Sequence, residues 1–222
     1  MTEAAREAAT EEGAPTAPRG IPVLGALACL CVALLGIEGL ERAPPTAALS
    51  WLRPSLVLAL WSLPALALAR WLGDPDPLES FALTRWPRPP HGPAAVLLLV
   101  ILPLYTLIAV GPLGLGAAKP PALLELPALF LSQALGVALA EELFFRGALQ
   151  SSLERRFGPR QGLVLSALLF ALAHVGTELA FARLLVFFPG LLFGWLRQRS
   201  DSLWPSVVMH AACNVVARFA PL

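Results

Sequence analysis

The amino-acid sequence predicts an all-α membrane protein, a polytopic bundle of about seven transmembrane helices. Hydrophobic residues make up 57% of the 222-residue chain and charged residues only 14%, and the mean hydropathy is +0.70. Soluble globular domains are far less apolar than this. The apolar residues also fall into seven windows, each close to the roughly 20 residues that an α-helix needs to cross a bilayer.

The predicted elements follow one another along the chain. Residues 1–20 are polar and carry both signs of charge, so we expect a disordered tail. The predicted spans cover residues 21–40, 52–72, 94–116, 127–153, 161–177, 179–197 and 203–220. Sequences rich in proline, glycine and charge separate most of them, namely APPT (43–46), GDPDP (73–77), RWPRPPHGP (85–93), KPP (119–121), FGPR (157–160) and RQRSDS (197–202). We therefore expect a single transmembrane domain over residues 21–222.

The distribution of charge predicts the orientation and the partners. Eleven of the 16 Lys and Arg residues lie on the same predicted side of the membrane as the amino terminus. Cytoplasmic loops hold the excess of positive charge, so we expect the amino terminus to be cytoplasmic. The abundance of Ala, Leu, Pro and Arg is typical of a GC-rich bacterial genome, so we expect the bacterial inner membrane. The net charge of +1 and the scattered basic residues give no indication of a nucleic-acid partner.

Three ionisable residues, Glu141, Glu142 and Arg146, lie inside the fourth window. Each ionisable group in a span costs at least a few kcal/mol, so each is a candidate functional residue. Glu142 and Arg146 are four residues apart, share a helix face and are able to pair, which favours a structural role for both. Glu141 is turned by about 100° around the helix from Glu142 and needs another explanation.

Further polar residues lie in two later windows: His174 in the fifth, and His210 and Asn214 in the seventh. The FGPR turn places the centre of the hairpin between the fourth and fifth helices near position 157.5, so Glu141 and His174 are each 16.5 residues from it. With an equal rise per residue on both arms, the two side chains should lie at one depth. His210 comes early in the last span and is expected nearer the cytoplasmic side.

A carboxylate, two imidazoles and an amide that converge in a dry site are suited to hydrolysis of a peptide bond. The carboxylate can take a proton from water and later pass it to the leaving amine, while one histidine orients that water. An imidazole and an amide NH₂ can donate hydrogen bonds to the oxyanion of the tetrahedral intermediate.

The polar residues form three motifs on three predicted helices: EELFFR (141–146), FALAH (170–174) and HAACN (210–214). In these motifs the sequence resembles the CPBP family of intramembrane proteases, also called the Abi or type II CAAX prenyl endopeptidase family. The motifs of that family are EExxxR, FxxxH and HxxxN or HxxxD, in the same order. The resemblance covers about residues 127–220, the expected catalytic core, and the first three spans share only their membrane character.

The resemblance implies a role for each motif residue. Glu141 would activate water with the assistance of His174, and His210 and Asn214 would form the oxyanion hole. The two motif residues with a structural role would be Glu142 and Arg146. We therefore predict an intramembrane endopeptidase that hydrolyses a peptide bond in a membrane-associated or C-terminally anchored protein.

The residues leave the cofactor and the substrate open. Glu141, His174 and His210 are able to ligate zinc, but no HExxH motif occurs and Asn is a poor zinc ligand, so no cofactor is favoured. Most bacterial members of the family have no prenylated substrate. A similar branch in GC-rich bacteria, the myxosortases, is thought to process C-terminal anchoring signals. The prenyl branch has eight spans where this sequence predicts seven, so the substrate entrance need not be shared.

Two other classes of function stay open. Buried Glu and His side chains also suit a transporter or a proton relay, but that role predicts charges along a path through the membrane, whereas the polar set here comes from three helices. A non-catalytic membrane scaffold or immunity protein would tolerate loss of the motif residues, and all of them are present.

Overall fold

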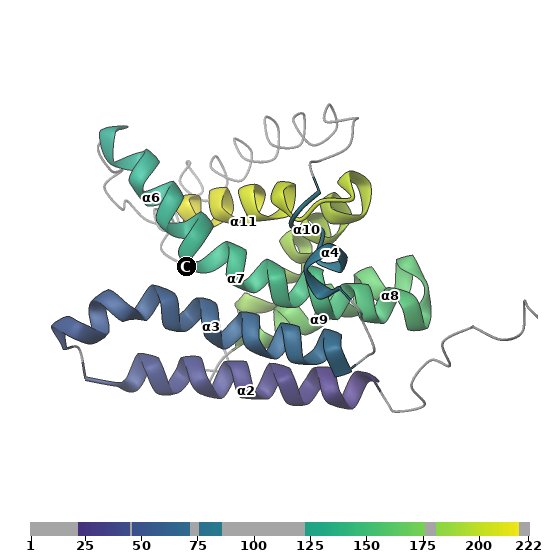
Figure 1. The fold of residues 1–222 in the computed structure, drawn as a ribbon. Coiled ribbons are helices and arrows are strands. Elements are labelled where there is room, and N and C mark those ends of the chain that lie inside the picture. Colours follow the sequence, from purple (N-terminus) through teal and green to yellow (C-terminus); the bar gives the residue numbers. More distant parts are fainter. Residues whose placement is uncertain (1–21, 45, 72–75, 86–122, 176–180, 218–222) are drawn as a thin grey trace, which may run out of the picture.

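The computed structural model describes residues 22–44, 46–71, 76–85, 123–175 and 181–217, and all regular elements in these ranges are helical (Figure 1). The all-α class predicted from the sequence is therefore confirmed for the described part of the chain. The predicted tail, residues 1–20, and the third predicted span, residues 94–116, lie outside the described residues.

The amino-terminal part is a hairpin of two long helices, α2 (Pro22–Arg42) and α3 (Ala47–Trp71), which lie side by side and are followed by the short helix α4 (Pro77–Ser80). The later part begins with a continuous run of five segments and continues with five helices. The five segments are the 3₁₀ turn η1 (Leu123–Glu125), α6 (Leu126–Gln133), the π-helix η2 (Ala134–Ala138), α7 (Leu139–Glu142) and the π-helix η3 (Leu143–Gln150). After them come α8 (Ser151–Phe157), α9 (Pro159–Val175), the 3₁₀ helix η4 (Phe181–Val186), α10 (Phe187–Ser200) and α11 (Trp204–Ala217).

One helix in the described ranges is long and apolar enough to cross a membrane by itself, the run Leu126–Phe157 of 32 residues. Three further apolar stretches have only 10 to 17 residues: Leu24–Leu40, Ser55–Trp71 and Pro159–Val175. A helix of this length is at or below the lower limit for spanning. The predicted count of seven spans is therefore not confirmed, although six of the seven predicted windows contain helices.

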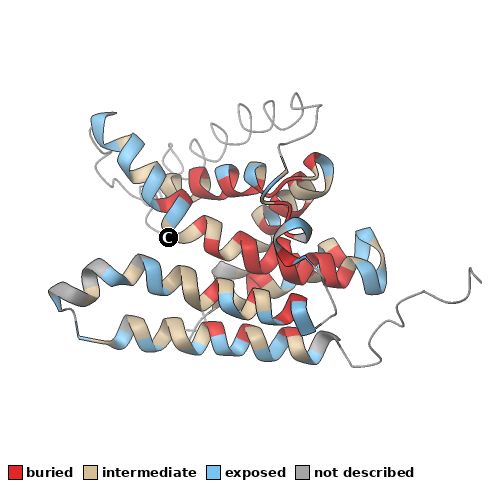
Figure 2. Cartoon of the chain, viewed as in Figure 1, coloured by how far each residue is buried: buried red, intermediate tan, exposed pale blue. Residues whose placement is uncertain are grey.

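Exposure in this fold differs from that of a water-soluble protein in two respects, because charged side chains are buried in the core and many large aliphatic side chains are exposed. Glu142, Arg146, Gln150 and His210 are buried, and Figure 2 shows the buried residues concentrated on α7 and the helices around it. Large aliphatic side chains are instead exposed on the outer faces of the helices, among them Leu24, Val32, Leu35, Leu52, Leu63, Leu131, Leu135, Val164, Leu168 and Leu172. Apolar patches of this extent suit a bundle surrounded by lipid.

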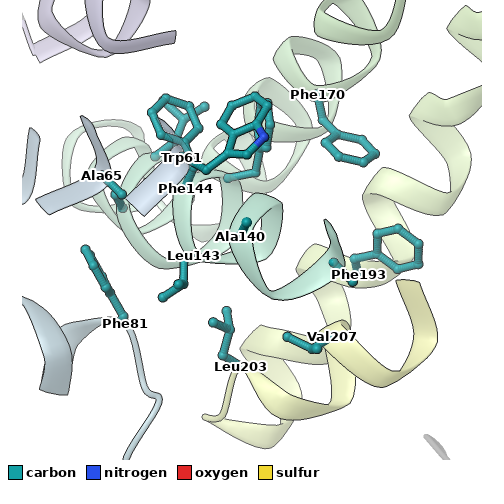
Figure 3. Packing of buried hydrophobic residues seen from close by; sticks show 14 of the residues in the cluster. Trp61, Ala65, Phe81, Ala140, Leu143, Phe144, Phe170, Phe193, Leu203 and Val207 are labelled. Atoms are coloured by element: carbon teal, nitrogen blue, oxygen red, sulfur yellow. The ribbon is translucent and has the colours of Figure 1, made fainter. Parts of the chain in front are cut away.

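Aromatic side chains join the amino-terminal hairpin to the later helices. Trp61 of α3 packs against Phe144 and Phe145 of η3, with ring centroids 5.3 Å apart in both pairs (Figure 3). Phe145 in turn meets Phe170 of α9 edge to face at 5.0 Å. Such pairs contribute about 0.5–1.5 kcal/mol each beyond the area that they bury, so the cluster ties both α3 and α9 to the long helix.

Two glycines allow α10 to approach its neighbours closely, and a Cβ atom on Gly190 would lie only 3.1 Å from Phe170 of α9. Arg146 donates a hydrogen bond to the carbonyl of Gly190 (3.0 Å), and one turn later Gln150 donates to the carbonyl of Gly194 (3.1 Å). A Cβ atom on Gly194 would collide with Gln150 and Leu163. This small-xxx-small pair exposes backbone carbonyls to buried polar side chains of the neighbouring helix.

Residues 81–85 are fastened to the turn between α10 and α11. Asp201, which ends α10 in a left-handed conformation (φ 51°), accepts two hydrogen bonds from Arg85, both at 3.0 Å. The negative charge of Asp201 is the largest cause of a raised pKa of Arg85. Leu203 N also donates to the carbonyl of Ala82 (3.2 Å). The start of α11 is therefore held by a segment that precedes it by more than a hundred residues.

Candidate active site

Glu141, His174 and His210 meet although they lie on three different helices, α7, α9 and α11. Glu141 Oε2 is 3.8 Å from His174 Nε2 and 3.7 Å from His210 Nε2. Glu141 Oε2 is buried and has no hydrogen-bond partner. Both separations are too long for direct hydrogen bonds, and one water molecule could bond to the carboxylate and to an imidazole at the same time.

The local helix geometry around Glu141 is unusual. The short helix α7 that carries Glu141 and Glu142 lies between the two π-helices, η2 and η3. A π-helix has wider turns than an α-helix and occurs frequently at functional sites. The sequence predicted one regular helix here, and this prediction was wrong in detail because residue propensities carry almost no information on a widened turn.

The hydrogen bonds of His174 determine which of its nitrogens carries a proton. Nδ1 lies 2.8 Å from the carbonyl oxygen of Phe170. A carbonyl can only accept, so Nδ1 must be the protonated nitrogen, and Nε2 of the neutral ring is then a hydrogen-bond acceptor that faces Glu141. The ring also packs on Phe170, with centroids 4.5 Å apart. The Phe170 carbonyl and ring therefore fix His174 with Nε2 directed to the carboxylate, and in the neutral form this nitrogen is an acceptor.

His210 is more deeply buried and is held on several sides. Its Nδ1 lies 2.9 Å from Glu142 Oε1. The ring stacks on Phe193 at a centroid distance of 4.9 Å and an interplanar angle of 13°, and Phe170 meets it edge to face at 5.7 Å. Residue count alone places His210 nearer the cytoplasmic side than Glu141, with helix tilt able to close several ångströms, and the two side chains lie 3.7 Å apart.

Glu142 and Arg146 pair as the spacing predicts, but the pair belongs to a larger cluster. Arg146 Nε lies 3.4 Å from Glu142 Oε2, and neither side chain is exposed (0% each). The guanidinium also lies 4.4 Å from the centre of the Phe170 ring. Sequence reasoning missed the contact between Glu142 and His210, and no sequence signal could have revealed it because 68 residues separate them.

Asn214 lies one turn after His210 on α11 and is partly buried. Within the described part of the chain its amide makes no hydrogen bond to Glu141, His174 or His210. The structure therefore brings two imidazoles and two carboxylates together, and it leaves the amide of Asn214 without a bond to them.

The side chains also bear on the zinc alternative. Among the described residues, no three His, Cys, Asp or Glu side chains are arranged to hold a metal ion. Glu141, His174 and His210 do not form such a group in this arrangement, so no zinc chemistry is derived from them. A metal-free reaction stays a prediction.

The site differs in exposure from one side to the other. The His174 side chain is 32% exposed and Glu141 14%, whereas His210 is only 4% exposed and Glu142 not at all. The site is therefore most accessible at His174 and least accessible at Glu142 and His210.

Comparison with protein families supports the resemblance inferred from the three motifs. Residues 123–216 match the family described as Type II CAAX prenyl endopeptidase Rce1-like. The matched region includes α6 to α11, and thus all three motifs, and it excludes α2, α3 and α4. Comparison with curated proteins and with solved structures gave no significant match.

Proposed function

Since residues 123–216 belong to the CPBP family of membrane proteases, we propose that this protein is an intramembrane endopeptidase in which Glu141 activates water. The observation that carries the proposal is the buried Oε2 atom of Glu141, which has no hydrogen-bond partner and faces the Nε2 atoms of two histidines. A buried carboxylate oxygen without a hydrogen-bond partner is unfavourable, and a role in catalysis is one reason for a protein to retain it.

The proton positions define how water would be held. The carboxylate of Glu141 and Nε2 of His174 both accept hydrogen bonds, so one water molecule would donate one hydrogen to each. Its oxygen lone pairs are then directed away from both groups and toward the substrate. The two residues thus orient the water in addition to making it more nucleophilic.

Hydrolysis would follow in two steps. Glu141 takes one proton from the water as its oxygen bonds to the carbonyl carbon of the peptide, and the carbonyl oxygen becomes an oxyanion. Glu141 then returns this proton to the amide nitrogen, the C–N bond breaks, and an amine and a carboxylic acid leave. His210 and Asn214 would donate hydrogen bonds to the oxyanion, at roughly 3 kcal/mol per donor.

We propose a membrane-associated or C-terminally anchored protein as the substrate. The exposed aliphatic surface favours a location in lipid, and an extended segment would approach Glu141 from the side of His174, which is the more exposed side of the site. We expect this reaction to need no metal. The bacterial inner membrane and the cytoplasmic amino terminus stay predictions from the sequence.

Glu141→Gln tests this function, because glutamine keeps the shape of the side chain and is unable to accept the proton. Membranes of the native host are compared for new protein termini by mass spectrometry, with wild-type protein and variants at matched levels. Glu125→Gln is the matched control, since it makes the same change at an exposed position where α6 begins.

We expect termini that disappear in Glu141→Gln and remain in Glu125→Gln, and the proteins that carry them are the substrates. If a stably folded Glu141→Gln variant gives the same termini as wild type, the protease proposal fails. Transport or scaffolding would then explain the buried polar residues better.

A further inference from the structure

The contact between His210 and Glu142 conflicts with a neutral His210 in the oxyanion hole. Nδ1 lies 2.9 Å from Glu142 Oε1, and an ionised carboxylate only accepts hydrogen bonds, so Nδ1 is protonated. In a neutral ring Nε2 would then carry no proton and could not donate to an oxyanion. His210 can act as a donor through Nε2 only if both of its nitrogens are protonated.

The charges around His210 favour this doubly protonated form. Two carboxylates, Glu141 and Glu142, and one guanidinium, Arg146, lie in the cluster, which leaves one excess negative charge if both histidines are neutral. An uncompensated charge inside a protein is strongly unfavourable. A second proton on His210 places a positive charge between the two carboxylates and makes the cluster neutral.

His174 is the less favourable position for this charge, because its Nε2 lies near the carboxylate of Glu141 only and its side chain is 32% exposed. Cys213 of α11 is the other titratable group near Glu142, and a thiol adds no positive charge. His210 contacts both carboxylates and is only 4% exposed, so it is better placed than His174 to balance the second carboxylate.

We propose that Glu142 is a positioning residue that holds His210 as an imidazolium, with Nε2–H available to the oxyanion. Arg146 keeps Glu142 ionised and in place, and Phe193 fixes the plane of the ring. The inference rests on the proposed function of Glu141. It assigns to Glu142 a role in the reaction in addition to the helix-supporting role that the sequence predicts.

The imidazolium also explains how charge is accommodated during the reaction. Before attack, the negative charge is on Glu141, 3.7 Å from His210 Nε2. After Glu141 has taken the proton from water, the charge is on the oxyanion, which forms next to Glu141. The same positive ring compensates both positions, so the step creates no new unpaired charge in the dry site.

The experiment separates this role from simple support of the helix. Glu142→Met with Arg146→Met replaces the buried ion pair by apolar side chains of similar length, a change that often leaves stability nearly unaltered. Purified variants are assayed on a peptide from the strongest substrate found in the comparison with Glu141→Gln. We expect kcat to fall about 100-fold or more with KM nearly unchanged, the range seen when an oxyanion donor is removed.

A double variant that folds and retains kcat within about threefold of wild type would overturn the proposal, because the pair would then be a support only. Glu142→Gln alone keeps an acceptor for Nδ1 but removes the charge, and we expect a loss of kcat of at least about tenfold. Wild-type kcat in this variant would equally overturn it.

NMR spectroscopy can test the protonation state of His210 in the wild-type protein itself. The chain has three histidines, so ¹⁵N signals of the rings can be assigned by replacing each in turn. We expect both nitrogens of His210 to be protonated at neutral pH, and a singly protonated ring would overturn the proposal. If Glu141→Gln loses cleavage while the double variant Glu142→Met with Arg146→Met is fully active, only this inference is rejected. If Glu141→Gln is active, the proposed function itself is rejected.

Discussion

Arg146→Met should destabilise the protein strongly. The guanidinium is completely buried, pairs with Glu142 at 3.4 Å, donates to the carbonyl of Gly190 at 3.0 Å and lies over the Phe170 ring at 4.4 Å. Removing one partner of a buried ion pair leaves the other charge uncompensated, at about 3–5 kcal/mol. The unpaired carbonyl and the lost contact with the ring add to this, although not independently, so we expect a loss of about 4 kcal/mol.

The chain contains a matched control for this variant. Arg42 pairs with Glu38 at the same four-residue spacing and at a shorter distance, 2.7 Å, but its side chain is 70% exposed. An exposed pair contributes only about 0–1 kcal/mol, so Arg42→Met should be nearly neutral. Burial, and not the distance between the charges, then determines the difference between the two variants.

The assay is reversible unfolding in detergent, followed by tryptophan fluorescence. Trp61 is buried against Phe144 and Phe145 and should report loss of the core. With about 2–4 °C per kcal/mol for a chain of this size, Arg146→Met should lower the midpoint by about 8–16 °C. Adding Glu142→Met should recover most of this loss. A midpoint like that of Arg42→Met, or no recovery in the double variant, would refute the argument from buried charge.

Two other predictions concern packing and metal. Gly194→Ala places a methyl group against Leu163 and Gln150 and should lower the free energy of unfolding by about 1–3 kcal/mol. The control, Gly136→Ala, has nothing within 4 Å of the added methyl group and should be neutral or slightly stabilising. Equal thermal unfolding midpoints for the two variants would show that α10 is free to move away. Incubation with EDTA or phenanthroline should change the cleavage rate of the purified protein by less than about twofold, since Glu141 is expected to activate water directly. A large loss of activity that added zinc restores would show instead that the water is metal-bound.

Much of the fold and part of the site are readable from the sequence. Window positions predict helices because hydrophobicity is a local property, and the turn at 157–160 predicts that Glu141 and His174 lie at one depth, in agreement with their distance of 3.8 Å. The two glycines in PGLLFG (189–194) were a readable signal for close helix packing that the sequence analysis did not use.

The remaining features depend on contacts that no local pattern encodes. The bond from His210 to Glu142 requires the rotation of α11 against α7, which is set by the packing of Phe193 and Phe170 and not by spacing. The two π-helices on either side of α7 likewise have no local pattern in the sequence that would predict them. The span count could not be confirmed because a hydropathy window does not distinguish a full crossing from a shorter helix packed inside the bundle.

The fastening of residues 81–85 to the turn before α11 affects how the protein can be divided. The family match begins at residue 123, yet the orientation of the helix that carries His210 depends on Arg85 and Ala82, which lie outside it. A fragment trimmed to the matched region would lose the partners of Asp201 and Leu203 at the start of α11. For transplantation of the helices of the candidate site into another scaffold, the unit that keeps His210 aligned therefore includes residues 82–85.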